Sequence, residues 1–440
     1  MIIYIFNGYK DNKYSGYMHL SKLFETQGES SLKKNGSTRK LVLKKQIFSI
    51  LYLEEQKTIA DLCGPVAVSI PTMTRIMHEL MDEGWVIELG AGESRGGRRP
   101  VFYGLNPSVR YILGIEMTKR YTRINVFDLQ NRPLGDTLQI DIELNKAPDT
   151  FEILKGEIDK FIVKYDLDKN RILGAGVCIP GLINKKSNIN YSYPNLGNKP
   201  LDVIFSELLD IPAYVEHDTK TMALGESWFG LARNKSNVLC LNVGSGIGLG
   251  MIMNGELYQG FSGFSGEFGH IQIDSDGELC DCGKIGCLET VASGSAIVAK
   301  AKSKIGAGKN SIIKKLVNDD IEKINLPVII KAAHQGDQYA IELIEESGGY
   351  LAWGMAILIH LLNPELIIIG GDMAGAGNLL SDPVKQKLNK YTINRIRQDT
   401  TIYISELKEH AGLLGTIPVV MTNLLSNEPN INNHNNPVQI

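Results

Sequence analysis

The spacing of apolar residues changes near residue 108 and divides the chain into two regions. Before that position, apolar side chains recur every three or four residues in three short stretches, as they do in amphipathic helices. After it, short apolar runs end at glycine, proline or asparagine, as buried strands do. The sequence therefore predicts a small helical region followed by a larger α/β region.

The first region, residues 39–107, is predicted to hold three helices and a β-hairpin. The helices cover residues 41–51, 59–63 and 70–81, and the strands cover residues 85–89 and 101–105. Thr58 and Ser69 stand where side chains cap helices, and Gly64-Pro65 should end the second helix. A tip rich in glycine and arginine, residues 90–100, joins the two strands. This order of elements is that of a winged helix-turn-helix.

The third predicted helix and the tip of the hairpin hold candidate DNA contacts. Ile76, Leu80 and Met81 should point inward, which leaves the opposite face of the helix for a major groove. Arginines at the tip would meet phosphate or the minor groove. The candidate DNA-binding residues are Thr72, Thr74, Arg75, Arg95, Arg98 and Arg99. In the alternative interpretation, the same elements form a protein-protein or regulatory module.

The second region repeats an arrangement of strands and helices. Strands are predicted over residues 112–117, 121–129, 137–142 and 172–179, and a helix over residues 149–165. The arrangement begins again with strands over residues 238–243 and 251–253, a long helix over residues 339–362 and a strand over residues 366–369. Such a repeat indicates a duplicated α/β fold with two lobes and a cleft between them.

Composition narrows the class of protein. Of the 440 residues, 43% are hydrophobic and 22% are charged, as in ordinary globular proteins. The formal net charge of -3 excludes a globally basic nucleic-acid coat, although it allows one local DNA-reading module. Without a signal sequence or a membrane-spanning run, the chain is expected to be cytoplasmic and to have no membrane partner. Residues 1–38 are expected to form a mobile arm and residues 426–440 a disordered tail.

One histidine and three cysteines fall within eighteen residues of the second region. They are His270, Cys280, Cys282 and Cys287. Thiolates and an imidazole form a ligand set suited to tetrahedral zinc, so a structural Zn²⁺ is expected. Glu267 and Glu289 flank the cluster. A loop that is held by a metal and fixes carboxylates in place predicts a polar pocket for a small molecule.

The hairpin tip and the cysteine-rich loop are similar to those of a known family. Residues 92–100 read Gly-Glu-Ser-Arg-Gly-Gly-Arg-Arg-Pro, and His270 precedes the motif Cys-x-Cys-Gly-x-x-Gly-Cys-x-Glu. From residue 39 to residue 426 the chain resembles the ROK family (repressors, open reading frames and kinases), in its transcriptional-repressor branch. The resemblance implies an actin-like, ribonuclease-H-like domain of the sugar-kinase superfamily. This domain would cover residues 108–425, bind sugar and form oligomers.

The resemblance also implies a sugar pocket. Pro180-Gly181 matches the turn that approaches the sugar, and Glu216-His217-Asp218 matches a Glu-Asn-Asp motif. In the kinases of the family, the aspartate of that motif is the general base, which would be Asp218 here. The implied sugar-binding residues are Asn195, His217, Asp218, Glu267, His270 and Glu289. Since His217 replaces the family's asparagine, the preferred sugar stays open.

The nucleotide half of the implied pocket departs further from the kinases. Glu116, Thr118 and Arg120 replace the first phosphate loop, Asp-x-Gly-x-Thr, and their side chains would obstruct a triphosphate. Glycines remain at the other nucleotide positions, but glycine also suits tight turns between strands and helices. This vestigial nucleotide site comprises Gly244, Gly246, Gly248, Gly370 and Gly371. ATP is therefore not expected as a cofactor.

Together these features predict a zinc-containing, sugar-responsive repressor that is not an enzyme. Its partners would be double-stranded operator DNA, a sugar or sugar-phosphate effector, and further copies of itself in a homodimer or homotetramer. Two alternatives stay open. One is an ATP-dependent sugar kinase with an accessory DNA head and Asp218 as its base, and the other is a ligand-binding regulator that recruits a protein partner.

Overall fold

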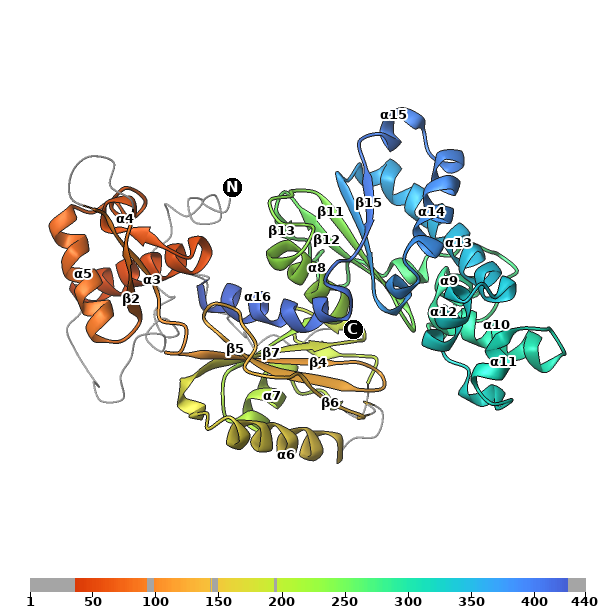
Figure 1. Cartoon of the computed structure of the whole chain (residues 1–440), viewed down its shortest axis with the longest axis horizontal. Coiled ribbons are helices and arrows are strands. Elements are labelled where there is room, and N and C mark those ends of the chain that lie inside the picture. The colour runs from red at the N-terminus through yellow and green to blue at the C-terminus, as the bar shows by residue number, and fades with distance from the viewer. Residues whose placement is uncertain (1–35, 93–98, 143, 145–148, 194–195, 426–440) are drawn as a thin grey trace, which may run out of the picture. The chain divides into compact units, whose positions relative to one another are not determined.

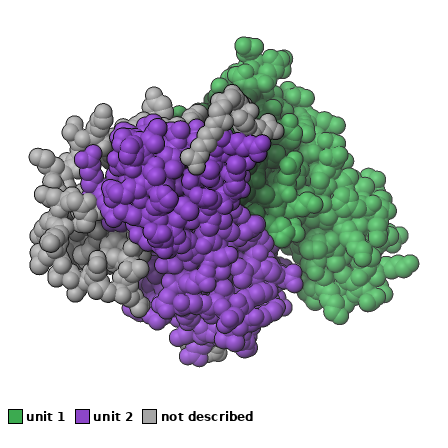
Figure 2. Space-filling model, turned by 60° about the vertical axis from the view of Figure 1, so that its left-hand side comes forward, with its two compact units in different colours: residues 1, 178–192, 216–415 green, residues 2–177, 193–215, 416–440 purple. Residues whose placement is uncertain are grey.

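The computed structural model describes residues 36–92, 99–142, 144, 149–193 and 196–425 (Figure 1). The predicted C-terminal tail, nearly all of the predicted N-terminal arm and most of the hairpin tip lie outside these residues. The chain forms two compact units, shown in different colours in Figure 2. Unit 1 contains residues 178–192 and 216–415, and unit 2 contains residues 2–177, 193–215 and 416–440.

The N-terminal part of unit 2 has the predicted order of helices and strands. Its helices are α3 (Gly36–Glu54), α4 (Ile59–Val66) and α5 (Ile70–Asp82). Its strands are β1 (Lys57–Thr58), β2 (Val86–Ala91) and β3 (Val101–Leu105), in an antiparallel sheet of order β1-β3-β2. The sequence did not predict β1, because two residues are too few to show an alternation of apolar and polar side chains.

Helix α4 begins as predicted and ends later than predicted. The Thr58 hydroxyl accepts a hydrogen bond from the Asp61 N–H, and the Asp61 carboxylate accepts one from the Thr58 N–H. The helix continues through Pro65 to Val66. The predicted end at Gly64-Pro65 is wrong, because the Ala67 N–H donates a hydrogen bond to the carbonyl of Cys63 and completes one more turn of helix.

Helix α5 differs from its prediction at its cap and on its buried face. Ser69 occupies the N-cap position, but its hydroxyl bonds Thr72 Oγ1 at 3.0 Å and caps no backbone N–H. The predicted Ser69 cap is therefore wrong. The fully buried residues are Met73, Ile76, Met77 and Leu80. They follow the i, i+3, i+4, i+7 spacing of one helix face, which leaves Met81 only half-buried and not inward as predicted.

The two larger sheets repeat one strand order, as the repeat in the sequence predicts. The first contains β4 (Tyr111–Met117), β5 (Thr122–Asp128), β6 (Leu138–Ile140), β7 (Ile172–Ile179) and β10 (Ala213–His217), in the order β10-β7-β4-β5-β6. The second contains β11 (Val238–Val243), β12 (Ile247–Met253), β13 (Glu256–Leu257), β14 (Leu366–Gly370) and β15 (Thr401–Ile404), in the order β13-β12-β11-β14-β15. In each sheet, three strands that are consecutive in the chain lie side by side. Two later strands extend the sheet on the other side of the first of these three strands.

Helices and short turns complete the described chain. The α-helices are α6 (Asp149–Lys164), α7 (Leu201–Leu209), α8 (Asp218–Phe229), α9 (Glu289–Ala292), α10 (Gly294–Gly306), α11 (Ile312–Leu316), α12 (Leu326–His334), α13 (Gln338–Leu362), α14 (Asn378–Tyr391), α15 (Asn394–Arg397) and α16 (Ala411–Leu425). The 3₁₀ turns are η2 (Lys169–Arg171), η4 (Phe268–His270), η5 (Ile321–Lys323), η6 (Asp372–Ala376) and η7 (Lys408–His410). Strands β8 (Ile183–Asn184) and β9 (Ile189–Asn190) form a separate hairpin. Within the described ranges, none of the helices has the length and apolar character that crossing a membrane requires.

The core of unit 1 lies on both faces of strand β14. Ile367 and Ile369 belong to a cluster that includes Leu351 and Met355 of α13. Ile368, between them, belongs to a second cluster that includes Met222 of α8. Because side chains alternate between the faces of a strand, α13 and α8 cover opposite faces of this sheet. A strand buried on both faces reads as a continuous apolar run, which is how the sequence predicted it.

Glycine lets helix α8 approach its neighbours closely on two sides. A Cβ at Gly248 of β12 would lie 2.2 Å from Thr219 Oγ1 of α8. A Cβ at Gly415 of α16 would lie 1.8 Å from the carbonyl oxygen of Thr221. Real Cβ atoms do not approach other atoms so closely, so these two contacts require glycine.

Gly415→Ala is expected to lower the free energy of unfolding by about 1–3 kcal/mol, because the methyl group would force α16 away from α8. Gly156→Ala in α6 is the matched control, since a Cβ there meets nothing within 4 Å. The control should raise the free energy of unfolding by about 0.5–1 kcal/mol. Urea unfolding followed by circular dichroism measures both. Equal changes in the free energy of unfolding would show that the contact between α16 and α8 does not require glycine at position 415.

Candidate metal centre and ligand site

The four predicted metal ligands come together in one part of unit 1. His270 ends the turn η4, and the three cysteines follow in the loop before α9. One ligand atom of each residue lies within 4.8 Å of those of all the others. Cys280 Sγ lies 3.5 Å from His270 Nδ1, and Cys282 Sγ lies 3.6 Å from Cys287 Sγ. Cys280 and Cys287 are buried, whereas Cys282 is exposed.

The two separations of 3.5 Å and 3.6 Å fit tetrahedral coordination of an ion of the size of zinc. With Zn–S and Zn–N bonds of ordinary length, two sulfur ligands lie about 3.8 Å apart, and a sulfur and a nitrogen about 3.6 Å apart. A disulfide would need a separation of about 2.05 Å, and all six cysteines are free. His270 Nδ1 and three Sγ atoms could therefore hold a metal ion, which leaves His270 Nε2 3.9 Å from Glu267 Oε2.

Tight backbone turns give the cysteine loop its shape. The Cys280 N–H bonds the Lys284 carbonyl at 2.8 Å, and the Gly283 N–H bonds the Cys280 carbonyl at 2.8 Å. Gly286 has φ +71°, and a Cβ there would lie 1.6 Å from the carbonyl oxygen of Asp274. Only glycine fits at this position, so the spacing of the cysteines depends on it.

The three thiols differ in acidity when no metal is bound. Burial raises the pKa of Cys287 to about 12, and the neighbouring thiols of Cys282 and Cys280 raise it as well. Burial also raises the pKa of Cys280. Burial acts in the same direction on Cys282, but the Lys284 N–H and the other two thiols outweigh it and lower its pKa. Because metals bind the thiolate, metal binding at neutral pH would release protons from the buried thiols.

Strand β12 connects this loop to the start of helix α8. The Leu249 N–H bonds the carbonyl of Gly266 at 3.1 Å, four residues before His270. Gly248, the preceding residue of the strand, lets Thr219 of α8 approach to contact distance. The two ends of the predicted sugar site therefore rest on neighbouring residues of one strand.

Glu289, at the start of α9, is tied to the beginning of the same strand. Its Oε2 accepts a hydrogen bond from the Ile247 N–H at 2.8 Å. A Cβ at Gly246 would lie 2.4 Å from that oxygen, so glycine is needed there for the contact. Glu289 thus has a structural role in addition to its predicted role in sugar binding.

Glu216, near the end of β10, is buried and has three polar contacts. Its Oε2 lies 2.9 Å from Lys185 Nζ and accepts from Gln259 Nε2 at 2.8 Å, and its Oε1 accepts from the His217 N–H at 2.9 Å. Burial raises the pKa of Glu216, but Lys185, the His217 N–H and Lys220 outweigh it and hold the pKa below its ordinary value. Glu216 is therefore charged at neutral pH and anchors the segments around the predicted sugar site.

His217 and Asp218 lie where β10 passes into α8. His217 is the N-cap of α8, and its Nδ1 accepts from the Thr219 N–H at 3.3 Å. An asparagine oxygen would accept the same bond, so the departure from the family motif preserves the cap. His217 Nδ1 also lies 3.2 Å from Asp218 Oδ1, so the imidazole contacts both the capped N–H and the neighbouring carboxylate. Side-chain exposures of 21% for His217 and 30% for Asp218 leave both accessible to a ligand.

Three polar residues near this site were missed by the sequence reasoning. Lys185 and Gln259 bond Glu216 from distant segments, and nothing in the sequence marks them. Lys220 is buried on α8 and donates from Nζ to the carbonyl of Gly263, which ties α8 to the loop before the metal ligands. Burial lowers the pKa of Lys220, while Glu216 raises it. A lysine immediately before an apolar helix segment is the only signal that could have identified it.

The predicted nucleotide-site glycines lie at the ends of strands β11 and β14 and within strand β12. Gly248 pairs with Asn242 inside the β11–β12 ladder, so only Gly244–Gly246 remain as a turn. Gly370 ends β14, and Gly371 has φ +77°, with its Cβ position 2.4 Å from Asn242 Oδ1. Strand β12 therefore begins before the predicted range of residues 251–253, and strand pairing and close packing account for most of these glycines.

The resemblance places the first phosphate loop at the turn between β4 and β5. The side chain of Thr118 binds the backbone N–H groups of this turn. The Thr118 hydroxyl accepts from the N–H groups of Arg120 at 3.2 Å and Tyr121 at 3.0 Å. These N–H groups are consequently occupied, whereas a phosphate loop presents them to its ligand. Glu116 forms a buried cross-strand ion pair with Arg123, with 3.0 Å between Oε2 and the guanidinium.

The structure describes some of the remaining residues that were predicted to contact DNA or sugar, and leaves out others. Arg95, Arg98 and Asn195 lie outside the described residues. Arg75 and Arg99 are exposed, while Thr72 and Thr74 are half-buried. Arg75 pairs with Glu79 at 2.9 Å on the surface of α5.

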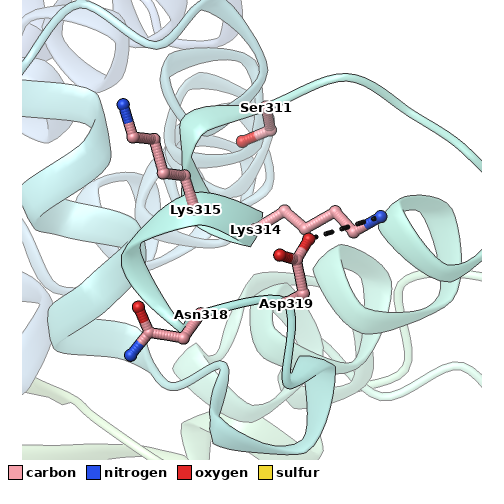
Figure 3. Close-up of a pocket in the computed structure, with 5 residues that line it drawn as sticks. All are labelled: Ser311, Lys314, Lys315, Asn318 and Asp319. Atoms are coloured by element: carbon pink, nitrogen blue, oxygen red, sulfur yellow. Dashed lines mark ion pairs between the residues drawn. The ribbon is translucent and has the colours of Figure 1, made fainter.

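Two surface cavities of unit 1 lie apart from these residues. The first, of about 370 Å³, is lined by Ser311, Lys314, Lys315, Asn318 and Asp319 (Figure 3). Lys314 and Asp319 form an ion pair of 3.6 Å across it. The second, of about 680 Å³, lies along α13 and α14. Neither cavity is lined by a predicted metal-binding or sugar-binding residue.

Known proteins resemble this chain over most of its length. The model of the ROK family matches residues 112–423. The xylose repressor of Caldicellulosiruptor bescii is 32% identical over 397 residues, which are 87% of this chain and 98% of the repressor. The DNA-binding transcriptional dual regulator NagC of Escherichia coli is 29% identical over 81% of this chain and 86% of NagC.

Solved structures show the same fold. A ROK family transcriptional regulator, a homologue of the Escherichia coli MLC protein, has a TM-score of 0.73 and 29% identity, and covers 88% of this chain and 98% of its own. A ROK glucokinase from Streptomyces griseus, in complex with glucose and AMPPNP, has a TM-score of 0.64 and 27% identity, and covers 71% of this chain and 99% of its own. The regulator thus covers about 75 residues more than the kinase, which is the size of the region from α3 to β3.

The purified protein is expected to contain one tightly bound metal ion per chain, and Cys287→Ser is expected to lose it, because a buried ligand is removed. Loss of the ion should lower the Tm by about 5 °C or more. Cys63→Ser is the control, since that thiol lies outside the cluster. Inductively coupled plasma mass spectrometry and thermal unfolding measure both effects. A metal-free native chain would rule out the site.

Proposed function

The chain belongs to the ROK family, and on that premise we propose that it is a sugar-responsive transcriptional repressor. Residues 39–107 would form a winged helix-turn-helix that binds operator DNA, and residues 108–425 would bind the effector and form oligomers. The main support for the proposal is the share of this chain that matches known repressors and regulators. Repressors and regulators match 81–88% of the chain, whereas the kinase structure matches 71% and leaves out a segment as long as the proposed DNA-binding head.

The proposed DNA-binding surface is the face of α5 opposite its buried side, together with the tip of the β2–β3 hairpin. Arg75 is exposed on that face, and Arg99 is exposed at the described end of the tip. Arg95 and Arg98 would add positive charge there. A single winged helix reads a short half-site, so a homodimer or homotetramer would bind a two-fold operator in the cytoplasm.

The proposed effector site combines carboxylates with an imidazole. Asp218, Glu267 and Glu289 would offer carboxylate oxygens, and His217 would offer its imidazole. Sugar hydroxyls both donate and accept, so such a set discriminates between epimers by leaving a wrong one unpaired. The metal in the cysteine cluster would be structural Zn²⁺, and its ligand His270 would keep Nε2 directed toward Glu267.

Kinase activity is the second candidate, because Asp218 is retained and partly exposed. Against it, the N–H groups of the β4–β5 turn are bonded to Thr118, and Glu116 is held by Arg123. A base without a seated phosphate donor transfers nothing. We therefore assign Asp218 to sugar binding.

The native protein is expected to retard a subset of genomic fragments in a gel shift at moderate salt, with affinity that depends on sequence. Replacing Arg98 and Arg99 together by alanine should weaken binding at least about tenfold and reduce the salt slope by about two, one unit for each lost phosphate contact. Arg233→Ala, an exposed arginine outside the proposed head, is the control. Unchanged affinity in the double variant would favour the regulator that recruits a protein.

A thermal-shift screen is expected to find a sugar or sugar phosphate that raises the Tm, because a ligand of the native state stabilises it by mass action. Asp218→Asn should reduce this shift, since a carboxylate acceptor is replaced by an amide. Mg-ATP, tested alone and with each sugar, should leave the Tm unchanged. A shift with Mg-ATP, accompanied by ADP release, would instead establish the kinase.

A further inference from the structure

Four apolar side chains lie on two neighbouring segments of unit 1 and form what we call the apolar platform. Leu182 and Tyr191 flank the β8–β9 hairpin, and Phe261 and Phe264 lie in the loop that follows β13. Phe261 is 90% exposed, Tyr191 55% and Leu182 36%, while Phe264 is half-buried. The ring centres of Tyr191 and Phe264 lie 6.2 Å apart, so the hairpin and the loop meet there.

The pairing of β8 with β9 explains why Leu182 and Tyr191 face outward. Ile183 pairs with Asn190, and both are buried. Leu182 and Tyr191 stand opposite each other at the next position of the hairpin, where the Tyr191 N–H bonds the Leu182 carbonyl at 2.9 Å. Because side chains alternate between the two faces of a strand, Leu182 and Tyr191 share the exposed face.

Backbone contacts hold the platform in place. The Lys185 N–H, in the hairpin, bonds the Ser262 carbonyl at 2.8 Å. Gly263 has φ +95°, and a Cβ there would lie 2.7 Å from the Lys185 nitrogen, so glycine is needed for this close packing. The Ser265 hydroxyl donates to the Tyr258 carbonyl at 2.8 Å and ties the two ends of the loop together. A ligand that bound to these side chains would therefore have little loop ordering to overcome.

The same segments connect the platform to the proposed effector site. Lys185 Nζ lies 2.9 Å from Glu216 Oε2, and Glu216 directly precedes His217-Asp218. Asn190 Nδ2 donates to the carbonyl of Pro180 at 2.9 Å, in the turn that was predicted to approach the sugar. The platform therefore adjoins the proposed effector site within unit 1.

We propose that the apolar platform is a subsite for a second sugar ring, so that the effector is a disaccharide or another glycoside. The negative face of an aromatic ring attracts the C–H groups on one face of a sugar, and polar groups beside it bind the hydroxyls. Phe261 and Tyr191 supply the rings. Lys186 Nζ, 3.5 Å from the centre of the Phe261 ring, supplies N–H donors. The subsite presupposes the proposed effector site, which would bind the first ring.

The size of the platform favours a sugar over a protein as its occupant. With about 200 Å² for each full side chain, the exposed parts of Leu182, Tyr191, Phe261 and the neighbouring Tyr258 amount to about 460 Å². A stable interface between proteins buries about 800 Å² on each partner. Aromatic rings beside a few polar groups are instead typical of small-molecule sites.

Isothermal titration calorimetry of the full-length protein tests the subsite. The probes are xylose, glucose and N-acetylglucosamine, each compared with its disaccharide: xylobiose, cellobiose or diacetylchitobiose. One disaccharide is expected to bind on the order of tenfold more tightly than its monosaccharide, because its second ring covers the platform. Phe261→Ala and Tyr191→Ala should each reduce this ratio several-fold, and Phe261→Tyr should preserve it. Tyr403→Ala on β15 is the matched control, since Tyr403 is 52% exposed and lies in the same unit.

The outcomes separate the subsite from the proposed function. Equal affinities for each disaccharide and its monosaccharide, or a ratio unchanged in both alanine variants, would overturn the subsite. A change of oligomeric state in Phe261→Ala with no change of the ratio, measured by sedimentation velocity, would also overturn it and make the platform a protein surface. Failure to bind any of the six sugars would remove the subsite together with the effector site. A protein that shows the ratio but retards no DNA fragment would keep the subsite and lose the repressor.

Discussion

Contact of backbone with backbone along strand β12 is the constraint on which the site in unit 1 depends. A Cβ at Gly266 would lie 1.9 Å from the Leu249 carbonyl oxygen, and one at Gly269 would lie 2.3 Å from that of Ile247. On α8, the backbone carbonyl oxygen of Thr219 lies 2.6 Å from the Cβ position of Gly250. Side chains at these positions would hold the loop and the helix apart. The residues of the proposed effector site could then no longer lie beside one strand.

The cysteine loop is shaped by turns and ligand atoms, because it has little apolar core of its own. Leu279 is 73% exposed and Ile285 is 47% exposed, so burial of these side chains contributes little stability. Four ligand atoms around one ion would supply the missing cross-links. The polar residues beside the loop follow the opposite principle, since Glu216 and Lys220 are buried and satisfied by fixed partners. Rigidity in this part of the protein therefore comes from buried polar contacts, and a bound metal ion would add to it.

Much of the fold could be predicted from apolar spacing, and the metal cluster from residue type. Strands β7 and β11 occupy the predicted ranges, because runs buried on both faces have a clear signal. The role of Gly248 stayed open, since a sequence cannot show whether a glycine approaches a phosphate or a neighbouring helix. The partners of Glu216 come from segments far apart in the chain, so no local spacing marks them. The Ser69 cap was wrong because Thr72 competes for the same hydroxyl.

The conformation of Gly286 has a consequence for the inheritance of this protein. Every missense change at its codon adds a Cβ where 1.6 Å separates that position from the Asp274 oxygen. Such an allele would disturb the cysteine loop, whereas helices α3 to α5 are encoded on a separate stretch of the gene. Selection on this codon would therefore act through backbone geometry, since even the smallest replacement side chain requires the backbone to move.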